Sequence, residues 1–433
     1  MTAMTYEGAE LKLLEDRLID RLGEVRLGDL PDPQPECPAR LVGATPMLER
    51  LWRVALRDIE SNIQETEDGR YFGGGAKFGV TVYTRDISYS GVLGLNRLYP
   101  QVMRDSLEAT RRVRRKAGFT VSRGHAVRAI EAPWEDLDVS EPEFKDRFHT
   151  NSYSRRTDDV VWLWAASDLF ALHGAEGADW EWLYSTGAEF FQAFYSYFYD
   201  PEDSLYRGQA SFIDVAWPER GRVGGYPQHF KIDDCLLLKA ASTNALYLKG
   251  MRVMAEAATQ LGKTEESREW SARADRLAKA IREHLVDADG RIVYYKDRHG
   301  ELSERWEALG TALCALHGAV DAETARRSVE RYPQTEIGIP VFHPFLEHDR
   351  VYHNKAAWPF VDTFFLAGAE KATGESKAAY NLALLARTAR DEDGFYELVN
   401  MLTGEVRGSG RQLWSAAGFV NACVRAGIEI TNA

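Results

Sequence analysis

The alternation of short and long connections between helical segments most limits what this chain can fold into. Apolar residues recur at i, i+3, i+4 and i+7 in segments such as LERLWRVALRDIESNI and DDVVWLWAASDLFALHG, which is the spacing of an amphipathic helix. Caps and breakers around such segments predict about twelve helices. We expect them at 46–64, 87–97, 100–116, 158–173, 179–197, 235–262, 264–285, 305–318, 321–331, 355–373, 375–391 and 411–426.

The connections after the even-numbered predicted helices are very short, as in LY and GAV, and a short connection makes two helices antiparallel neighbours. Those after the odd-numbered helices are long: 65–86, 117–157, 198–234, 286–304, 332–354 and 392–410. This alternation places every long loop at one end of the assembly. The sequence therefore predicts an all-α (α/α)6 toroid with a funnel on its loop-rich face. An α-solenoid is disfavoured because no repeat of fixed period is visible.

The N-terminal stretch MTAMTYEGAELKLLEDRLIDRL is acidic and has helical spacing, without the basic and apolar regions of a signal peptide. Composition does not change abruptly after the Pro-rich stretch PDPQPECPAR at 31–40. We therefore expect residues 1–45 to form a short helical arm and lead-in, and residues 46–433 to form one large domain. Strand-like alternation is scarce and brief, as in GRIVYYKD at 290–297, so we expect minimal sheet.

Charge and composition exclude several classes of protein. The net charge of −13, from 53 basic and 66 acidic side chains, disfavours a nucleic-acid partner. No apolar run approaches the roughly 18 residues of a membrane span. The four cysteines, Cys37, Cys235, Cys314 and Cys423, lie far apart, which indicates reduced thiols in a cytoplasmic protein. The histidines show no ligand spacing, so we expect neither metal nor cofactor. A homo-oligomer is left open.

Two acidic residues stand out on different long loops. Asp214 lies in the apolar, aromatic sequence SFIDVAWPER, and Glu397 lies in DEDGFYELVN before a Gly-rich turn. Cleavage of a glycosidic bond uses two carboxyl groups, one to protonate the leaving oxygen and one to activate water or attack the sugar. An acid in apolar surroundings tends to stay protonated near neutral pH. Either residue alone could be a salt-bridge or capping residue, but the shared face and the aromatic neighbours favour a glycosidase with a small carbohydrate as its partner.

The chain resembles the six-hairpin glycosidases, especially trehalases and bacterial members of glycoside hydrolase family 63, over roughly residues 70–426. The patches that carry the resemblance are SFIDVAWPER, KAASTNALYLKGMRVMAEAATQLGKTEESREW, YHNKAAWPFVDTFFLAGAEKATG and YELVNMLTGEVRGSGRQLWSAAGF. It implies that Asp214 is the general acid and that Glu397, in a motif E-x-x-x-x-x-T-G, is the general base. Two short sequences depart from the family pattern, SFID at the acid and ELVNM at the base. The resemblance therefore does not specify the sugar.

The long loops also carry polar and aromatic residues that we expect to bind the sugar: Tyr83, Arg85, Asp86, Trp217, Glu219, Arg220, Asn244, His353, Trp358, Tyr396 and Trp414. Structural roles are alternatives for several of them. Asp86 and Asn244 could cap helices, Trp358 could belong to the core, and Glu219 could pair with Arg220.

Arginines on these loops bear on the charge of the substrate. A guanidinium binds a carboxylate through two parallel hydrogen bonds, and the resembling family includes hydrolases of glyceric-acid glycosides. We expect at least one of Arg85, Arg220 and Arg222 to face the substrate, which would favour an anionic aglycone. The alternative is that these arginines pair with acidic residues on the surface.

These observations together predict an inverting, exo-acting glycoside hydrolase that cleaves a small α-linked glycoside or disaccharide. The alternatives are a sugar epimerase, lyase or phosphorylase on the same toroid, or a carbohydrate-binding toroid without catalysis. The Glu397 motif has no purpose in paired-histidine epimerisation or in phosphorolysis, and a binding protein would not need two apposed acids.

Overall fold

The computed structural model describes residues 4–26, 34–66, 69–76, 82–116, 148–149, 157–214, 224–230, 232–391 and 394–431. The helices predicted from apolar spacing are present there, with ends displaced by a few residues. They are α1 (Pro46–Glu60), α4 (Pro100–Lys116), α7 (Asp158–His173), α8 (Gly177–Phe198), α10 (Ala241–Gln260), α11 (Thr264–His284), α12 (Ala308–Leu316), α13 (Ala322–Arg331), α14 (Pro359–Thr373), α15 (Ala378–Thr388) and α16 (Leu413–Arg425).

Two predicted helices are interrupted. The segment predicted at 87–97 consists of α2 (Thr84–Ser90), the π-helical turn η2 (Gly91–Leu95) and α3 (Asn96–Leu98). A Cβ at Gly94 would lie 2.7 Å from the Val420 side chain, so the glycine lets this turn approach α16 closely. The segment predicted at 235–262 consists of the short α9 (Ile232–Leu237) and α10.

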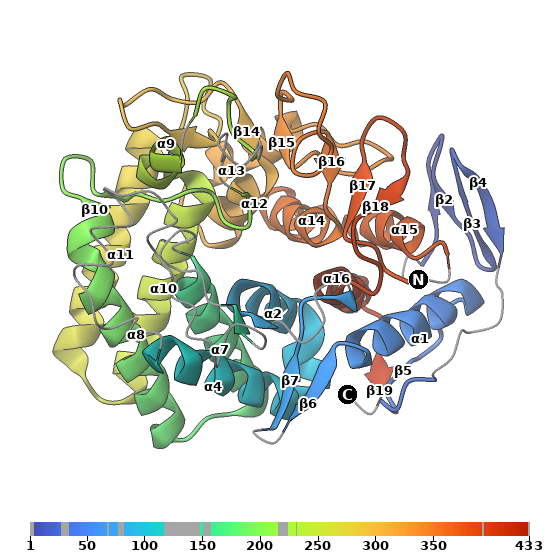
Figure 1. Ribbon diagram of the computed structural model, residues 1–433, viewed down its shortest axis with the longest axis horizontal. Coiled ribbons are helices and arrows are strands. Elements are labelled where there is room, and N and C mark those ends of the chain that lie inside the picture. The colour runs from blue at the N-terminus through green and yellow to red at the C-terminus, as the bar shows by residue number, and fades with distance from the viewer. Residues whose placement is uncertain are drawn as a thin grey trace.

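Six of the described helices contact one another in a closed cycle, in the order α2, α7, α10, α12, α14, α16 and back to α2 (Figure 1). Outside it, α4 contacts α2 and α7, α8 contacts α7 and α10, α13 contacts α12 and α14, and α15 contacts α14 and α16. The helix α11 packs along α10, and α1 packs along α16. Burial follows these positions, because α12 is buried on nearly every face whereas α13 buries only Ala325, Ser328 and Val329.

Short connections join α2 (through η2 and α3), α7, α10, α12 and α14 to the helices packed outside them, and long ones lead back to the cycle. The sixth cycle helix, α16, is the last described helix, and its outer neighbour α1 is the first. Only Tyr99 separates α3 from α4, and residues 261–263 separate α10 from α11. Gly374, in the left-handed conformation at φ 75°, ends α14, as glycine commonly does at a helix C-terminus. The predicted alternation of short and long connections is therefore confirmed, and the N-termini of the cycle helices share one end with the long loops.

Short strands mark the places where the chain reaches the cycle helices. We call β12 (Lys239–Ala240), β14 (Trp306–Glu307) and β16 (Ala356–Ala357) the pre-helix strands, because α10, α12 and α14 follow them almost directly. Each pairs with a strand from the long loop before the next cycle helix: β13 (Tyr295–Lys296), β15 (Phe342–His343) and β17 (Leu398–Asn400) respectively. The parallel pair β8 (Val82–Tyr83) and β9 (Phe148–His149) lies ahead of α2 and α7, and β18 (Val406–Arg407) extends β17.

Apart from the N-terminal strands β1 to β4, the remaining described strands form small antiparallel pairs. These are β5 (Arg40–Leu41) with β19 (Ile430–Thr431), β6 (Ile63–Thr66) with β7 (Gly69–Phe72), and β10 (Tyr199–Asp200) with β11 (Leu205–Tyr206). The described residues therefore contain more β-strand than we expected from the sequence. Strands of two residues are too short to leave an alternating apolar pattern in the sequence.

The expected N-terminal helical arm is wrong. Residues 6–26 form an antiparallel sheet of β1 (Tyr6–Glu7), β2 (Lys12–Leu13), β3 (Arg17–Asp20) and β4 (Gly23–Arg26), drawn in blue at the edge of the molecule (Figure 1). Leu11, Leu13 and Leu18 are buried, while Gly23 has a φ of 117° and makes the turn that reverses the chain. Leucines three and four residues apart suited a helix, but burial follows the sheet.

This sheet is held against the body by carboxylates. Glu336 accepts hydrogen bonds from the backbone N–H groups of Ala9, Glu10 and Leu11, and Asp20 lies 2.7 Å from the guanidinium of Arg390. No helix in the described ranges is both long and apolar enough to span a bilayer.

Candidate active site

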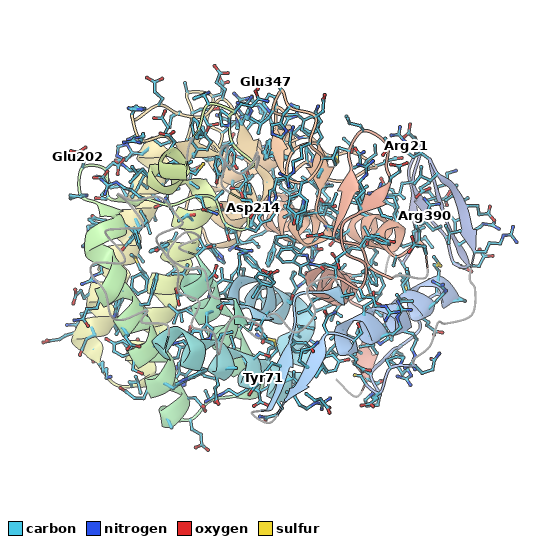
Figure 2. The ribbon with its side chains drawn as sticks, viewed as in Figure 1. Arg21, Tyr71, Glu202, Asp214, Glu347 and Arg390 are labelled. Carbon is cyan, nitrogen blue, oxygen red and sulfur yellow. The ribbon has the colours of Figure 1, made fainter. Side chains whose placement is uncertain are left out.

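The predicted catalytic residues occupy long loops at the same end of the helix cycle. Asp214 lies on the segment that leads from β11 towards α10, and Glu397 immediately precedes β17, on the loop that leads to α16. Figure 2 shows Asp214 near the middle of the view, whereas labelled residues such as Glu202 and Arg21 lie towards its margin. The loop topology therefore directs both carboxyl groups to the same end of the molecule.

Glu397 is buried and held through both carboxylate oxygens. The residue is 1% exposed. Its Oε1 accepts a hydrogen bond from the Tyr352 hydroxyl at 3.0 Å, and its Oε2 accepts one from the Ser409 backbone N–H at 3.0 Å. The Glu397 backbone N–H in turn donates to the Ser409 carbonyl. Hydrogen bonds to a carboxylate are charge-assisted and favour its ionised form.

The Asp214 side chain is 43% exposed and contacts His353. The Asp214 backbone N–H donates to Nε2 of His353 at 3.2 Å, and the same nitrogen lies 3.5 Å from Oδ2 of the Asp214 side chain. His353 is 4% exposed. The acid predicted from the sequence therefore reaches solvent, while its histidine partner lies behind it in the protein.

The adjacent residues Tyr352 and His353 connect the two carboxyl groups. Tyr352 contacts Glu397, His353 contacts Asp214, and the two rings lie edge to face with centroids 4.7 Å apart. Burial raises the pKa of Tyr352, and the charges of Glu397, Asp214 and Asp86 raise it further. Tyr352 thus remains a hydrogen-bond donor, and its hydroxyl feels three carboxylates, two from long loops and Asp86 from α2.

Aromatic side chains pack against this pair. Trp358 is buried at the N-cap of α14, where its Nε1 donates to the Tyr352 carbonyl at 2.8 Å. Its ring stacks on His353 with centroids 5.3 Å apart and an interplanar angle of 15°. Trp414 is also buried and stacks on Phe360, and within the described part of the chain its Nε1 has no hydrogen-bond partner.

The predicted sugar-binding pair Arg85 and Asp86 lies at the start of α2. The residue that caps this helix is Tyr83, so the alternative of Asp86 as N-cap is wrong. Nη2 of Arg85 lies 3.3 Å from Asp86, and Nη1 lies 3.8 Å from Asp158. The guanidinium is therefore buried between two carboxylates.

Asn244 lies inside α10 and is fully buried, so it is not an N-cap. Its Nδ2 donates to the carbonyls of Tyr206 and Ala240, and its Oδ1 accepts from the Tyr206 backbone N–H. These bonds fix β11 against α10, and β11 leads into the Asp214 segment.

The other predicted site residues divide into two groups. Tyr83 and Tyr396 are half-buried on the loops before α2 and α16. Trp217, Glu219, Arg220 and Arg222 lie outside the described residues.

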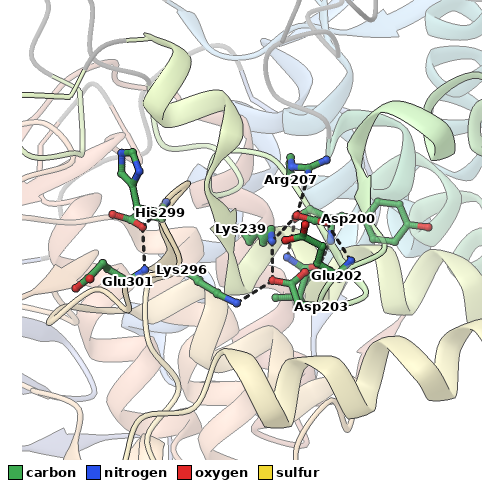
Figure 3. A network of polar contacts seen from close by, with 12 residues as sticks. Asp200, Glu202, Asp203, Arg207, Lys239, Lys296, His299 and Glu301 are labelled. Atoms are coloured by element: carbon green, nitrogen blue, oxygen red, sulfur yellow. Dashed lines mark hydrogen bonds and ion pairs between the residues drawn. The ribbon is translucent and has the colours of Figure 1, made fainter. Parts of the chain in front are cut away.

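A network of ion pairs anchors the segment that carries Asp214 (Figure 3). Nζ of Lys239 lies 2.7 Å from Asp200 and 2.6 Å from Asp203, while Lys296 also reaches Asp203 at 2.9 Å and Arg207 reaches Asp200 at 2.7 Å. Burial opposes ionisation of Asp203, but hydrogen bonds from Lys239 and Lys296 outweigh it and hold its pKa below the usual value. The network joins the β10–β11 hairpin to β12 and β13.

Sequence reasoning missed a buried acid, Glu307, beside α12. The residue is the N-cap of this helix and is 1% exposed. Burial raises the pKa of Glu307 to about 8, although the polar groups of Ser242 and Gly310 act in the opposite direction. Ser242 in turn accepts from the backbone N–H of Ser211, three residues before Asp214. Nothing in the local sequence WEALG distinguishes such an acid from a helix cap.

The described residues contain no group of three or more His, Cys, Asp and Glu side chains that could hold a metal ion. The side chains that these loops bring together include the carboxyl groups of Asp214 and Glu397, the Tyr352 hydroxyl and the His353 imidazole.

Known proteins resemble this chain in both sequence and fold. The sequence profile of the mannosylglycerate hydrolase MGH1-like glycoside hydrolase domain matches residues 88–415, which is more than half of the chain. A mannosylglycerate hydrolase of Rubrobacter radiotolerans is 30% identical over 202 residues, covering 43% of this chain and 44% of that relative. The match thus spans less than half of the relative's length.

Solved structures share the fold at low sequence identity. A wild-type glycosidase superposes with a TM-score of 0.61 at 17% identity, covering 88% of this chain and 97% of its own. The GH63 mannosylglycerate hydrolase from Thermus thermophilus, in complex with Tris and D-glycerate, has a TM-score of 0.61 at 17% identity and covers 86% and 99%. The resemblance to family 63 glycosidases is confirmed, and the chain belongs to the mannosylglycerate hydrolase MGH1-like family of glycoside hydrolases.

Proposed function

We propose that the chain is an inverting, exo-acting glycoside hydrolase built as an (α/α)6 toroid. The closed cycle of six described helices and the helices packed outside it support two concentric rings. The long loops at one end form the funnel, with residues 46–433 as the catalytic domain and the N-terminal sheet as an accessory to it.

Asp214 acts as the general acid and Glu397 as the general base. The observation that carries this assignment is the contact path through Tyr352 and His353, which joins the two carboxyl groups at the same end of the helix cycle. The exposed Asp214 suits the side from which the leaving group departs. The buried Glu397 suits the opposite side, because hydrogen bonds to both of its oxygens favour the carboxylate that a general base requires.

In the reaction, the Asp214 hydroxyl gives its proton to the glycosidic oxygen as the bond to the anomeric carbon breaks. A water attacks that carbon from the opposite face, and its proton passes to Glu397. One such displacement inverts the configuration at the anomeric carbon. Tyr83, Asp86, Tyr396 and Trp414, with Trp217 and Glu219, contact the sugar.

The substrate that we propose is a small α-linked glycoside of glyceric acid. The relatives support it, because two of them are mannosylglycerate hydrolases and one was solved with D-glycerate. Within the described part of the chain, Nε and Nη1 of Arg85 have no hydrogen-bond partner, but Asp86 and Asp158 offset its charge. Arg220 and Arg222 are therefore the better candidates for a carboxylate aglycone.

We also propose a reducing, cytoplasmic location, because none of the four cysteines forms a disulfide. Disulfides persist mainly in oxidising compartments.

The test is release of sugar from a panel of α-glycosides, including glycerate, glycerol and disaccharide glycosides, with and without phosphate. Asp214→Asn and Glu397→Gln should each lower kcat by about 10²–10⁴-fold, the usual contribution of general acid–base catalysis. Glu330→Gln, on the exposed surface of α13, should leave kcat unchanged. Proton NMR should show the β-anomer as the first product. Retained activity in the Glu397 variant would reject its role, and phosphate dependence would indicate a phosphorylase.

A further inference from the structure

We propose that Tyr352 and His353 form a positioning pair that sets the protonation of the two carboxyl groups in opposite directions. Tyr352 keeps Glu397 ionised, and His353 keeps Asp214 protonated. This inference rests on the proposed acid and base roles of those carboxyl groups. It concerns two neighbouring residues of one loop, and neither of them exchanges a proton with the substrate.

Tyr352 reaches Glu397 as a neutral donor. The hydroxyl donates to Oε1 at 3.0 Å while the Ser409 N–H donates to Oε2, so both hydrogen bonds favour the carboxylate over the carboxylic acid. Without the tyrosine hydroxyl, a carboxylate that is 1% exposed would lose one of the hydrogen bonds that favour its ionised form. Its affinity for a proton would rise, because burial disfavours the charged form.

The nitrogen of His353 that faces Asp214 is an acceptor, Nε2. The Asp214 backbone N–H donates to Nε2, and an imidazole nitrogen that accepts a hydrogen bond carries no proton. The ring proton therefore lies on Nδ1, which is buried without a hydrogen-bond partner among the described residues. At 3.5 Å from Oδ2, the Nε2 lone pair disfavours a negative charge on Asp214 and is placed to accept from its protonated form after a small rotation of the carboxyl group.

Hydrogen bonds and ring contacts hold the loop that carries the pair. Trp358 bonds the Tyr352 carbonyl and stacks on His353, and Phe212 packs edge-on against the same imidazole at 5.2 Å. Asn354, the next residue, closes the loop through hydrogen bonds with the Leu346 backbone and the His348 carbonyl. A pair held in this way can fix the orientation of side chains on two other loops.

Other charged groups also act on the pair from the elements packed against it. Asp86 at the start of α2 raises the pKa of Tyr352 alongside Glu397 and Asp214, and Arg85 offsets part of that charge at 3.3 Å from Asp86. The Arg350 guanidinium lies 5.9 Å from the Tyr352 ring centroid. None of these groups is changed in the variants below, so their effects cancel in each comparison.

The two residues should therefore govern different limbs of the pH profile of kcat/KM. Activity falls at low pH when the general base Glu397 becomes protonated, so the low-pH (acid) limb follows the pKa of the base. Activity falls at high pH when the general acid Asp214 loses its proton, so the high-pH (alkaline) limb follows the pKa of the acid. A residue that merely maintains packing would lower the plateau and leave both limbs in place.

The first experiment compares the wild type with Tyr352→Phe. The acid limb should move to higher pH by about one unit, which is a tenfold change in proton affinity and is in the range of one hydrogen bond to a charged group. The alkaline limb should stay. Tyr380→Phe is the matched control, since it removes a tyrosine hydroxyl that donates to the Thr335 carbonyl beside the N-terminal sheet, away from both carboxyl groups.

The second experiment uses two replacements of His353. His353→Phe keeps a ring against Trp358 but has no lone pair, and His353→Gln keeps an acceptor for the Asp214 N–H while adding an amide donor. Both should move the alkaline limb to lower pH by about half a unit or more, and the Gln variant should keep more of the thermal stability. His317→Phe is the control, because this buried histidine packs against Trp164 at the far end of α12.

An alkaline limb that moves to higher pH would show that His353 is a charged donor and would overturn its part of the proposal. Limbs that stay in place in Tyr352→Phe and His353→Phe, while Asp214→Asn and Glu397→Gln abolish hydrolysis, would reject the positioning pair and leave the proposed function intact. Activity that survives in Asp214→Asn or Glu397→Gln would instead reject the proposed function itself.

Discussion

The backbone beside Glu397 allows no side chain at residue 408. Gly408 has a φ of 87°, and a Cβ there would lie 2.2 Å from Oε2 of Glu397. Replacing Gly408 with Ala should therefore displace the carboxylate as well as strain the backbone. We expect kcat to fall by about 10²-fold or more, in the range of a lost general base, and the stability of the fold to fall by about 1–2 kcal/mol.

The matched control is Gly174→Ala at the end of α7. This glycine has a φ of 82° and no atom within 4 Å of its ideal Cβ, so the substitution carries the same kind of backbone strain in open space. Thermal unfolding should show similar losses in both variants, whereas steady-state kinetics should show a loss of kcat only at Gly408. Equal kcat values in the two variants would mean that the Glu397 position does not limit turnover.

At the same scale, the sequence indicates the two carboxyl groups but not what holds them. Asp214 and Glu397 stand out because each acid lies among aromatic residues on a long loop. Tyr352 lies in the quoted patch YHNKAAWPF, yet its bond to Glu397 spans 45 positions and leaves no local pattern. Glu307 likewise has the sequence context of an ordinary helix cap, and only its burial shows that its carboxyl group stays protonated near neutral pH.

At the scale of elements, the ion network around Lys239 should be a main support of the β10–β11 hairpin. The Lys239 and Asp203 side chains are 9% and 6% exposed. Lys239→Met would leave buried carboxylates with fewer partners, and breaking a buried pair typically costs about 3–5 kcal/mol. Because Lys296 and Arg207 remain, we expect a loss near the lower end, about 3 kcal/mol, measured by urea unfolding.

The control for that measurement is Arg326→Met on α13, which removes an exposed arginine paired with Glu323 and Glu330. Exposed pairs contribute less than about 1 kcal/mol, so this variant should unfold close to the wild-type midpoint. A loss in Lys239→Met no larger than in the control would show that the network contributes little.

Helices are the most predictable elements of this chain and strands the least. Apolar spacing over ten or more residues locates a helix because the period is repeated several times, which is why the predicted helical segments lie within a few residues of the observed ones. The N-terminal leucines fit the helical period over a short stretch, but a turn at Gly23 and the docking of the backbone onto Glu336 favour a sheet. That docking partner lies more than 300 residues away, beyond any local pattern.

At the scale of the whole molecule, Glu307 should make the protein less stable as the pH rises. The unfolded carboxyl ionises near its ordinary pKa of 4.5, whereas the folded one stays protonated up to about 8. The stability that depends on the neutral form is therefore complete below about pH 4.5 and is lost as the pH rises to about 8. One unit of pKa difference corresponds to about 1.4 kcal/mol, so the loss amounts to a few kcal/mol.

Glu307→Gln removes the charge and keeps the size of the side chain. Melting temperatures measured between pH 4 and pH 9 should converge at the acidic end, and the variant should be the more stable protein above pH 8. Other titrating groups are common to both proteins, so their effects cancel when the melting temperatures of the two proteins are compared at the same pH. Parallel melting curves for the two proteins over the whole range would contradict a buried neutral Glu307.

The pairing of the pre-helix strands decides what can be exchanged between members of this family. The strand before α10 is completed by the loop before α12, the strand before α12 by the loop before α14, and the strand before α14 by the loop before α16. A single loop transplanted from a homologue would arrive without the neighbour that completes its sheet. The smallest transferable unit is two consecutive loops, so changes of substrate range, whether in evolution or by design, should come in adjacent pairs around the helix cycle.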